Sequence, residues 1–212
     1  MLKRYLPILI LFFGILYIFF IPPEPVSIKI LFKVIPMVLI ISYAFSQIPS
    51  QSTKYRALIL LGLIFCMIGD GTLIWFVVGL SAFLIGHLFY AAGFISGWKF
   101  SIYRVLSIIP IAIYAFFLCS NLVGSLNESG QENLVIPVIT YSVAISMMVF
   151  TAIMTGNKWA ILGSLLFIIS DSILSWDLFV ESVKYGHELI MITYYTAQFL
   201  IAKSILNRKS VA

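Results

Sequence analysis

Long apolar runs follow one another along the whole chain, separated by short polar stretches. Runs of about 20 apolar residues are typical of membrane-spanning helices, because a helix of that length crosses the hydrocarbon core. Charged residues, prolines and glycines set the boundaries of the runs and predict an all-α protein with eight transmembrane helices. The predicted spans are 5–21, 28–45, 57–75, 78–96, 102–122, 134–154, 159–176 and 187–205.

The connections between these spans are short, except for the stretch 123–133, which is rich in Asn, Ser, Gly and Glu. This stretch divides the chain into halves of four spans each, 1–122 and 134–212. No segment has the composition of a soluble domain, so we expect one transmembrane domain over residues 1–212. The first run follows two cations, as in a signal peptide, but it lacks a small-residue cleavage site and is interpreted as a retained span.

Composition supports the membrane interpretation and excludes a nucleic-acid-binding one. The 212 residues are 62% hydrophobic and only 10% charged, more apolar surface than a soluble domain of this size can bury. The net charge of +5 comes from cations scattered in short loops, which positive-inside topology explains better than a nucleic-acid partner does. We therefore expect a multi-pass protein of the cell membrane, or of an endomembrane if the source is a eukaryote.

Charge also predicts the orientation of the spans. Eight spans place both termini on one side, and ten of the thirteen cations then fall on that side: Lys3, Arg4, Lys54, Arg56, Lys99, Arg104, Lys158, Lys203, Arg208 and Lys209. All eight acids fall in the opposite half. Because cytoplasmic loops collect Lys and Arg, both termini are predicted to be cytoplasmic.

One stretch occurs twice, as LGLIFCMIGDGTLIW at 61–75 and LGSLLFIISDSILSW at 162–176. Each copy places a lone carboxylate, Asp70 or Asp171, inside an apolar run, eight residues after a Gly and five before a Trp. A carboxylate inside a membrane span is costly and indicates a functional site. If the halves are repeats, the offset of four helices makes them parallel, with a shared site near their interface. Chance similarity between apolar helices is the alternative.

Further polar residues are predicted at the depth of the two aspartates. At ~1.5 Å per residue, each Asp lies roughly 8 Å below its Trp. Five spans contribute to this layer, which looks like the lining of a cavity; its other members are Lys33, His87, Tyr90, Tyr194, Tyr195 and Gln198.

Such a cavity is suited to general acid–base chemistry. Two carboxylates in a partly dry site should not both ionise freely, so one becomes a proton donor beside an ionised partner. Lys33 or His87 could select which Asp keeps the proton, and the tyrosines could orient water or a substrate headgroup. The chain has no G-x-S-x-G motif and no phosphate-cradling loop, and one His with two Asp is few for zinc, so neither metal nor cofactor is expected. The structural alternatives are an Asp–Lys33 pair between helices, a snorkelling Lys33, and packing roles for His87 and the tyrosines.

At these residues the sequence resembles the lysoplasmalogenase (YhhN-like) family of multi-span membrane proteins. The resemblance rests on Lys33-Val-Ile-Pro36, Gly69-Asp70 with Leu73, His87-Leu-Phe-Tyr90, the stretch from Gly163 to Asp171, and Thr193-Tyr194-Tyr195-Thr-Ala-Gln198. Family members hydrolyse the vinyl ether bond of lysoplasmalogens to a fatty aldehyde and a glycerophospho-base, and the two in-span aspartates are regarded there as catalytic. The resemblance thus implies catalytic roles for Asp70 and Asp171 and a lysophospholipid-like substrate. Asp177-Leu178-Phe179 replaces the Asn-Lys-Phe of eukaryotic relatives and leaves the headgroup open.

Two other classes remain alternatives. A small proton-coupled transporter or lipid carrier would use the same in-membrane carboxylate pair. A non-catalytic membrane scaffold would leave the polar layer without a role. The sequence leaves the oligomeric state open.

Overall fold

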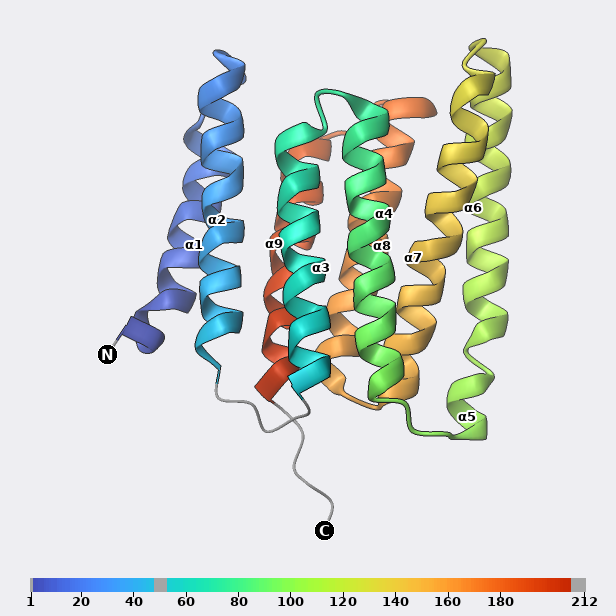
Figure 1. Cartoon of the computed structure of the whole chain (residues 1–212). Coiled ribbons are helices and arrows are strands. Elements are labelled where there is room, and N and C mark those ends of the chain that lie inside the picture. The colour runs from blue at the N-terminus through green and yellow to red at the C-terminus, as the bar shows by residue number, and fades with distance from the viewer. Residues whose placement is uncertain (1, 48–52, 207–212) are drawn as a thin grey trace.

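The computed structural model describes residues 2–47 and 53–206, which form helices and connections without any strand (Figure 1). The eight long helices are α1 (Leu2–Phe20), α2 (Val26–Ser46), α3 (Thr53–Thr72), α4 (Phe76–Ser96), α6 (Ile108–Glu128), α7 (Val135–Thr155), α8 (Lys158–Phe179) and α9 (Gly186–Lys203). The short helical segments are α5 (Ile102–Val105), η1 (Glu132–Leu134) and η2 (Ser204–Leu206). The all-α, eight-helix prediction is confirmed.

Length and composition make these helices membrane spans. Among the described residues, seven helical segments are long and apolar enough to cross a membrane, and Tyr5–Phe20 is a shorter apolar helix. Large apolar side chains such as Phe116 and Ile136, both 76% exposed, face outward along them, as expected for surfaces in contact with lipid. The chain is therefore a multi-pass membrane protein.

The fifth span differs from its prediction. The expected helix 102–122 consists of the short α5 followed by α6, which continues to Glu128 through much of the stretch expected to be a connection. Pro110 lies in the first turn of α6, where a helix tolerates proline. At the other end, Leu122 and Leu126 lie one turn apart and pack with Val138 of α7. Their burial extends the helix through residues whose polar neighbours indicated a loop.

The two halves of the chain use the same pattern of helix neighbours. In the first half α2 packs on α1 and α3, and α3 packs on α4; in the second half α7 packs on α6 and α8, and α8 packs on α9. The halves meet where α2 contacts α9 and where α7 contacts α4. A duplicated four-helix unit with parallel halves would give this arrangement, although duplication itself stays a prediction.

Glycines allow the central hairpins to pack closely. A Cβ on Gly62 of α3 would lie 2.4 Å from the Tyr90 ring of α4, and one on Gly163 of α8 would lie 2.8 Å from the Ile201 side chain of α9. Small residues at helix contacts let backbones approach and strengthen dispersion contacts within a membrane. The recurring Gly79, Gly86 and Gly93 of α4 pack against α3 and its C-terminal turn in the same way.

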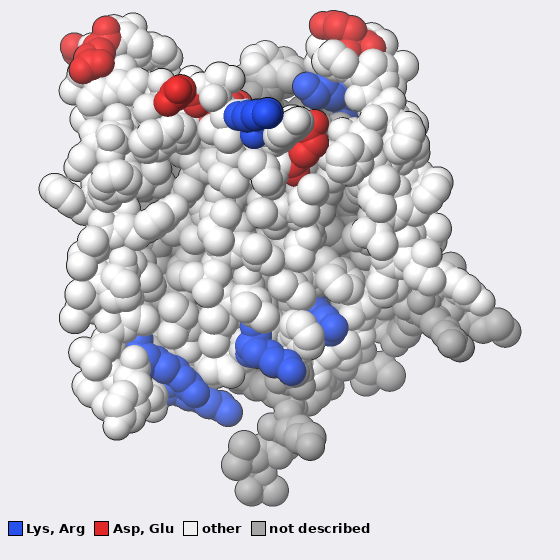
Figure 2. Space-filling model, turned by 180° about the vertical axis from the view of Figure 1, so that it is seen from behind, with Lys and Arg blue, Asp and Glu red and all other residues white. Residues whose placement is uncertain are grey.

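Acidic residues gather at one end of the bundle, formed by the connections 21–25, 73–75, 129–134 and 180–185 and called the acidic end below (Figure 2). In Figure 2 the other end carries only Lys and Arg among its visible charged side chains. Helix α1 begins and α9 ends at that other end (Figure 1). The direction in which the bundle crosses the membrane stays a prediction.

Candidate active site

A cavity of about 560 Å³ lies between the helices in the half of the bundle nearest the acidic end. Its lining includes Pro23 and Glu24 from the α1–α2 connection and Ile74 from the α3–α4 connection. Both in-span aspartates, Asp70 and Asp171, lie deeper in the same lining. The structure therefore places in one cavity two carboxylates that are 101 positions apart in the sequence (171 − 70).

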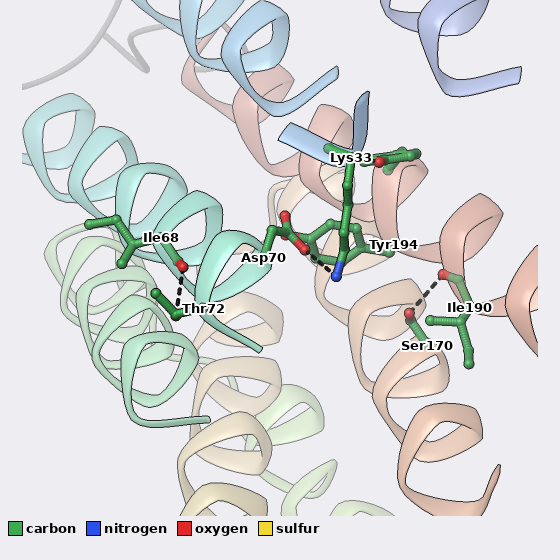
Figure 3. A network of polar contacts seen from close by, with 8 residues as sticks. Lys33, Ile68, Asp70, Thr72, Ser170, Ile190 and Tyr194 are labelled. Carbon is green, nitrogen blue, oxygen red and sulfur yellow. Dashed lines mark hydrogen bonds and ion pairs between the residues drawn. The ribbon is translucent and has the colours of Figure 1, made fainter. Parts of the chain in front are cut away.

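Asp70 lies in the last turn of α3 and has two partners from other helices (Figure 3). The Lys33 Nζ of α2 lies 3.1 Å from Asp70 Oδ1, and the hydroxyl of Tyr194 in α9 donates a hydrogen bond of 2.6 Å to Oδ2. The side chain of Asp70 is only 2% exposed and that of Lys33 15%. In such a buried site a cation and a hydroxyl donor together favour the ionised carboxylate.

Asp171 lies in α8, two turns before the end of the helix, and has a different partner. The hydroxyl of Tyr141 in α7 donates to Asp171 Oδ2. Among the described residues, the ion pair between Lys33 and Asp70 has no counterpart at Asp171. Ser170 and Ser172, on either side of Asp171, donate instead to the backbone carbonyls of Ile190 and Ile168. Asp171 is therefore a carboxyl group held by a phenol, without a cation.

Sequence reasoning missed Tyr141. Helices α2 and α7 occupy matching places in the two halves, and Lys33 and Tyr141 each lie about two turns from the start of their helix. If the two halves are treated as repeats, the position in α7 that corresponds to Lys33 in α2 lies at the level of Tyr141. A tyrosine in an apolar span gives little signal by itself.

The Tyr195 hydroxyl stabilises the helix that carries Lys33. It donates to the backbone carbonyl of Lys33 at 2.8 Å, joining α9 to α2. Pro36 lies inside α2 one turn later, and a proline in a helix interior removes one backbone donor and bends the helix. Tyr195 is not part of the cavity lining, so its contribution to the site is to fix α2 near this proline.

The remaining predicted residues lie behind the cavity. The Tyr90 hydroxyl donates to Gln198 Oε1 at 2.6 Å, and both side chains are fully buried. His87 is also fully buried, with ring contacts to Tyr90, Tyr141 and Phe167. Neither of its ring nitrogens has a hydrogen-bond partner among the described residues. Of the eight predicted site residues, the structure brings Lys33, Asp70, Asp171 and Tyr194 to the cavity and places the other four outside its lining.

The walls of the cavity differ in character. Helix α2 and the start of α9 contribute Lys29, Lys33 and His187. Across the cavity, α6, α7 and α8 contribute apolar side chains interleaved with polar ones. The apolar ones include Leu118, Leu122, Val138, Ile145 and Leu174, and the polar ones include Tyr141, Ser142, Ser146, Ser175 and Asp177. Both lysines of the lining therefore lie on α2, and the opposite side offers apolar surface together with hydroxyl groups, which can accommodate an amphiphile.

The donor set favours proton transfer. In the described ranges, no group of three or more His, Cys, Asp or Glu side chains is placed to hold a metal ion. Two carboxyl groups in one cavity, one paired with a cation and one with a hydroxyl, are the arrangement that general acid–base catalysis needs.

Fold and site together define a helical membrane protein with a carboxylate pair in a cavity between its spans. The chain belongs to the YhhN family, whose model matches residues 28–205.

Named relatives match over most of the chain. Lysoplasmalogenase TMEM86B of Mus musculus is 28% identical over 97% of this chain and 88% of its own length, and the Homo sapiens protein of that name is 30% identical over 96% and 87%. A protein named lysoplasmalogenase from Mycobacterium bovis is 31% identical over 64% of this chain and 53% of its own length. No solved structure matches the chain.

Proposed function

We propose that the protein is a membrane hydrolase that cleaves the vinyl ether bond of lysoplasmalogen-like lysophospholipids. The products are a fatty aldehyde and a glycerophospho-base. The relatives named lysoplasmalogenase support this activity. The observation that carries the mechanism is the presence of Asp70 and Asp171, with unlike partners, in one cavity.

Cavity size and lining support a single-chain lipid substrate. Small-molecule sites have volumes of roughly 300–1,000 Å³ and mainly apolar walls with a few polar groups. The cavity of about 560 Å³ lies within this range, and α6, α7 and α8 contribute Leu118, Leu122, Val138, Ile145 and Leu174 to its lining. One hydrocarbon chain fits against these apolar side chains while the glycerol part faces α2 and α9.

The partners of the two carboxylates suggest their roles. Asp70, beside Lys33 and Tyr194, is the ionised member of the pair. Asp171 accepts the Tyr141 hydrogen bond on Oδ2 and carries its proton on Oδ1. This assignment places the proton donor on α8, where Leu174 also lines the cavity, and the anion beside Lys33 of α2, which the glycerol part faces.

These roles match the chemistry of a vinyl ether. Asp171 protonates the double-bond carbon farther from the ether oxygen, leaving an oxocarbenium ion at the nearer carbon, which the Asp70 carboxylate stabilises. Water attacks that carbon and passes its proton to Asp70. The resulting hemiacetal then breaks down: Asp70 protonates the leaving glycerol oxygen while Asp171 recovers a proton from the hydroxyl group. Both carboxyl groups return to their starting states.

The test uses purified protein in detergent micelles, incubated with vinyl ether, alkyl ether and acyl lysophospholipids. We expect aldehyde from the vinyl ether substrate and no aldehyde from a protein carrying both Asp70→Asn and Asp171→Asn. A proton-coupled transporter or lipid carrier would release no aldehyde, because it moves a lipid without cleaving it and micelles offer no second compartment to move it to. Absence of product from all three substrates would refute the proposal.

A further inference from the structure

Lys29 is a charged cavity residue that the proposed acid–base chemistry does not use. It lies in the first turn of α2, and its neighbour one turn deeper on the same face, Lys33, is paired with Asp70. Among the residues that the structure describes, Lys29 has no carboxylate within ion-pair distance. An unpaired cation in the lining of a cavity is available to bind an anionic group of a ligand.

Membrane topology does not account for this lysine. The acidic end is the end where cations are scarce, and Lys29, Lys33 and Lys184 are the three that the sequence places there. Two of the three line the cavity from consecutive turns of α2, although like charges at this spacing repel each other. Asp70 offsets the charge of Lys33, whereas Glu24, which also lines the cavity, makes no ion pair with Lys29, so an anionic group of a ligand would supply the partner that Lys29 lacks.

The spacing of the lysines matches the dimensions of a lysophospholipid. Four residues of helix separate Lys29 from Lys33, which is ~6 Å along the α2 axis. Five covalent bonds separate the ether oxygen of such a lipid from its phosphorus, also about 6 Å when extended. With the reacting bond at the level of Asp70 and Lys33, the phosphate reaches the level of Lys29, nearer the acidic end.

We propose that Lys29 forms a phosphate-binding subsite that selects lysolipids with a phosphodiester headgroup over neutral glycerol ethers. This inference rests on the proposed hydrolase function for the identity of the lipid. The ammonium group of Lys29 binds the phosphate oxygens, while the hydrocarbon chain lies along α6, α7 and α8. Lys29 thereby fixes which end of the lipid faces α2 and keeps the vinyl ether between the two aspartates.

The test compares a lysoplasmenyl phosphoethanolamine with the matching 1-alkenylglycerol, which has the same vinyl ether and no phosphate. Because Lys29→Gln removes a charge-assisted hydrogen bond, it should lower kcat/KM for the phospholipid ~10- to 100-fold and leave kcat/KM for the alkenylglycerol unchanged. Most of the loss should appear in KM, and Lys29→Arg should retain most of the activity. Lys184→Gln is the matched control, because Lys184 lies at the same end of the bundle but outside the cavity lining. This variant should leave kcat/KM unchanged for both substrates.

Equal losses on both substrates, or no loss on either, would overturn the subsite. A measurement of ligand binding distinguishes failure of the Lys29 subsite from failure of the proposed hydrolase function. The non-cleavable 1-alkyl glycerophosphoethanolamine and 1-alkylglycerol are titrated into protein in nanodiscs, and Lys29→Gln should weaken only the former. If the wild-type protein binds the phospholipid through Lys29 but releases no aldehyde, the subsite stands and the hydrolase proposal falls. If inorganic phosphate competes for binding to the wild-type protein and not to Lys29→Gln, the subsite also accepts free phosphate.

Discussion

Asp70 and Asp171 differ in the chemical type of the partner that the preceding helix supplies, and Asp70 also accepts a hydrogen bond from Tyr194 of α9. Each carboxylate lies on the second of two neighbouring helices, and the first helix, α2 or α7, supplies its partner about two turns from its start. In the first half the partner is the ammonium group of Lys33, and in the second it is the phenol of Tyr141. In the proposed mechanism, a near-symmetric scaffold thus produces one anion and one acid by changing the partners while leaving the carboxylates themselves unchanged.

The largest expected effect is loss of turnover when either carboxylate is neutralised. Asp70→Asn and Asp171→Asn should each lower kcat by ~10²–10⁴-fold, because each removes one acid–base group. Aldehyde release from a lysoplasmenyl lipid measures the effect, and unchanged elution in size-exclusion chromatography controls for folding. A loss below about tenfold for either variant would contradict the two-carboxylate mechanism.

The pH profile tests which Asp does what. Asp70 must be ionised, so activity should fall as pH decreases; Asp171 must be protonated, so activity should also fall as pH increases. The profile of the wild type should therefore be bell-shaped and report the pair. Lys33→Gln should move the acidic limb of the profile, and Tyr141→Phe should move the alkaline limb. If Lys33→Gln moves the alkaline limb and Tyr141→Phe the acidic limb, Asp70 is the acid and Asp171 the anion.

Removing the cation should destabilise the protein more than removing the whole ion pair. Lys33→Met leaves the buried Asp70 carboxylate without its cation and should cost about 3–5 kcal/mol in the free energy of unfolding. Lys33→Met combined with Asp70→Asn should recover most of that loss. Lys184→Met, which removes an exposed cation, is the control. Unfolding in mixed micelles measures the stability of all three variants. Equal stability of the Lys33→Met and Lys184→Met variants would show that Asp70 without its cation is not a costly buried charge.

The two tyrosines should differ in the size of their effects. In the proposed mechanism Tyr194 donates to an ionised carboxylate, so Tyr194→Phe should cost ~1.5–3 kcal/mol in stability. In the same mechanism Tyr141 donates to a neutral carboxyl group, so Tyr141→Phe should cost only ~0.5–1.5 kcal/mol. The same unfolding assay compares them. A larger cost at Tyr141 would indicate that Asp171 carries the charge.

The smallest effect on activity is expected at Tyr195, whose hydroxyl donates to a backbone carbonyl and to neither Asp. Tyr195→Phe should cost about 0.5–1.5 kcal/mol in stability and leave the shape of the pH profile unchanged. This variant is the matched control for Tyr194→Phe, because the two residues are adjacent in α9. A changed pH profile would mean that Tyr195 acts on the carboxylates through α2.

Sequence reasoning predicted the helices well because membrane spans have a strong hydrophobic signal. It also selected Asp70, Asp171 and Lys33, since a charge inside a span is costly and therefore informative. The prediction of the cavity lining failed where the signal is weak. A histidine inside a span suggested a site residue, yet the rings of Tyr90, Tyr141 and Phe167 contact His87, which lies outside the lining. The end of α6 was missed because Leu122 and Leu126 gain their packing partner, Val138, from another helix.

The position of Asp70 in the last turn of α3 restricts where the chain can change length during evolution or engineering. Only residues 73–75 connect α3 to α4, and Gly79 of α4 packs so tightly against Leu73 that an added Cβ would lie 2.6 Å from its Cα. One residue inserted there would displace Asp70 or break that contact. Asp171 is followed by two further turns of α8 and the connection 180–185, so insertions after Phe179 leave its helical register unchanged. Length variation should therefore be tolerated between α8 and α9 and excluded between α3 and α4.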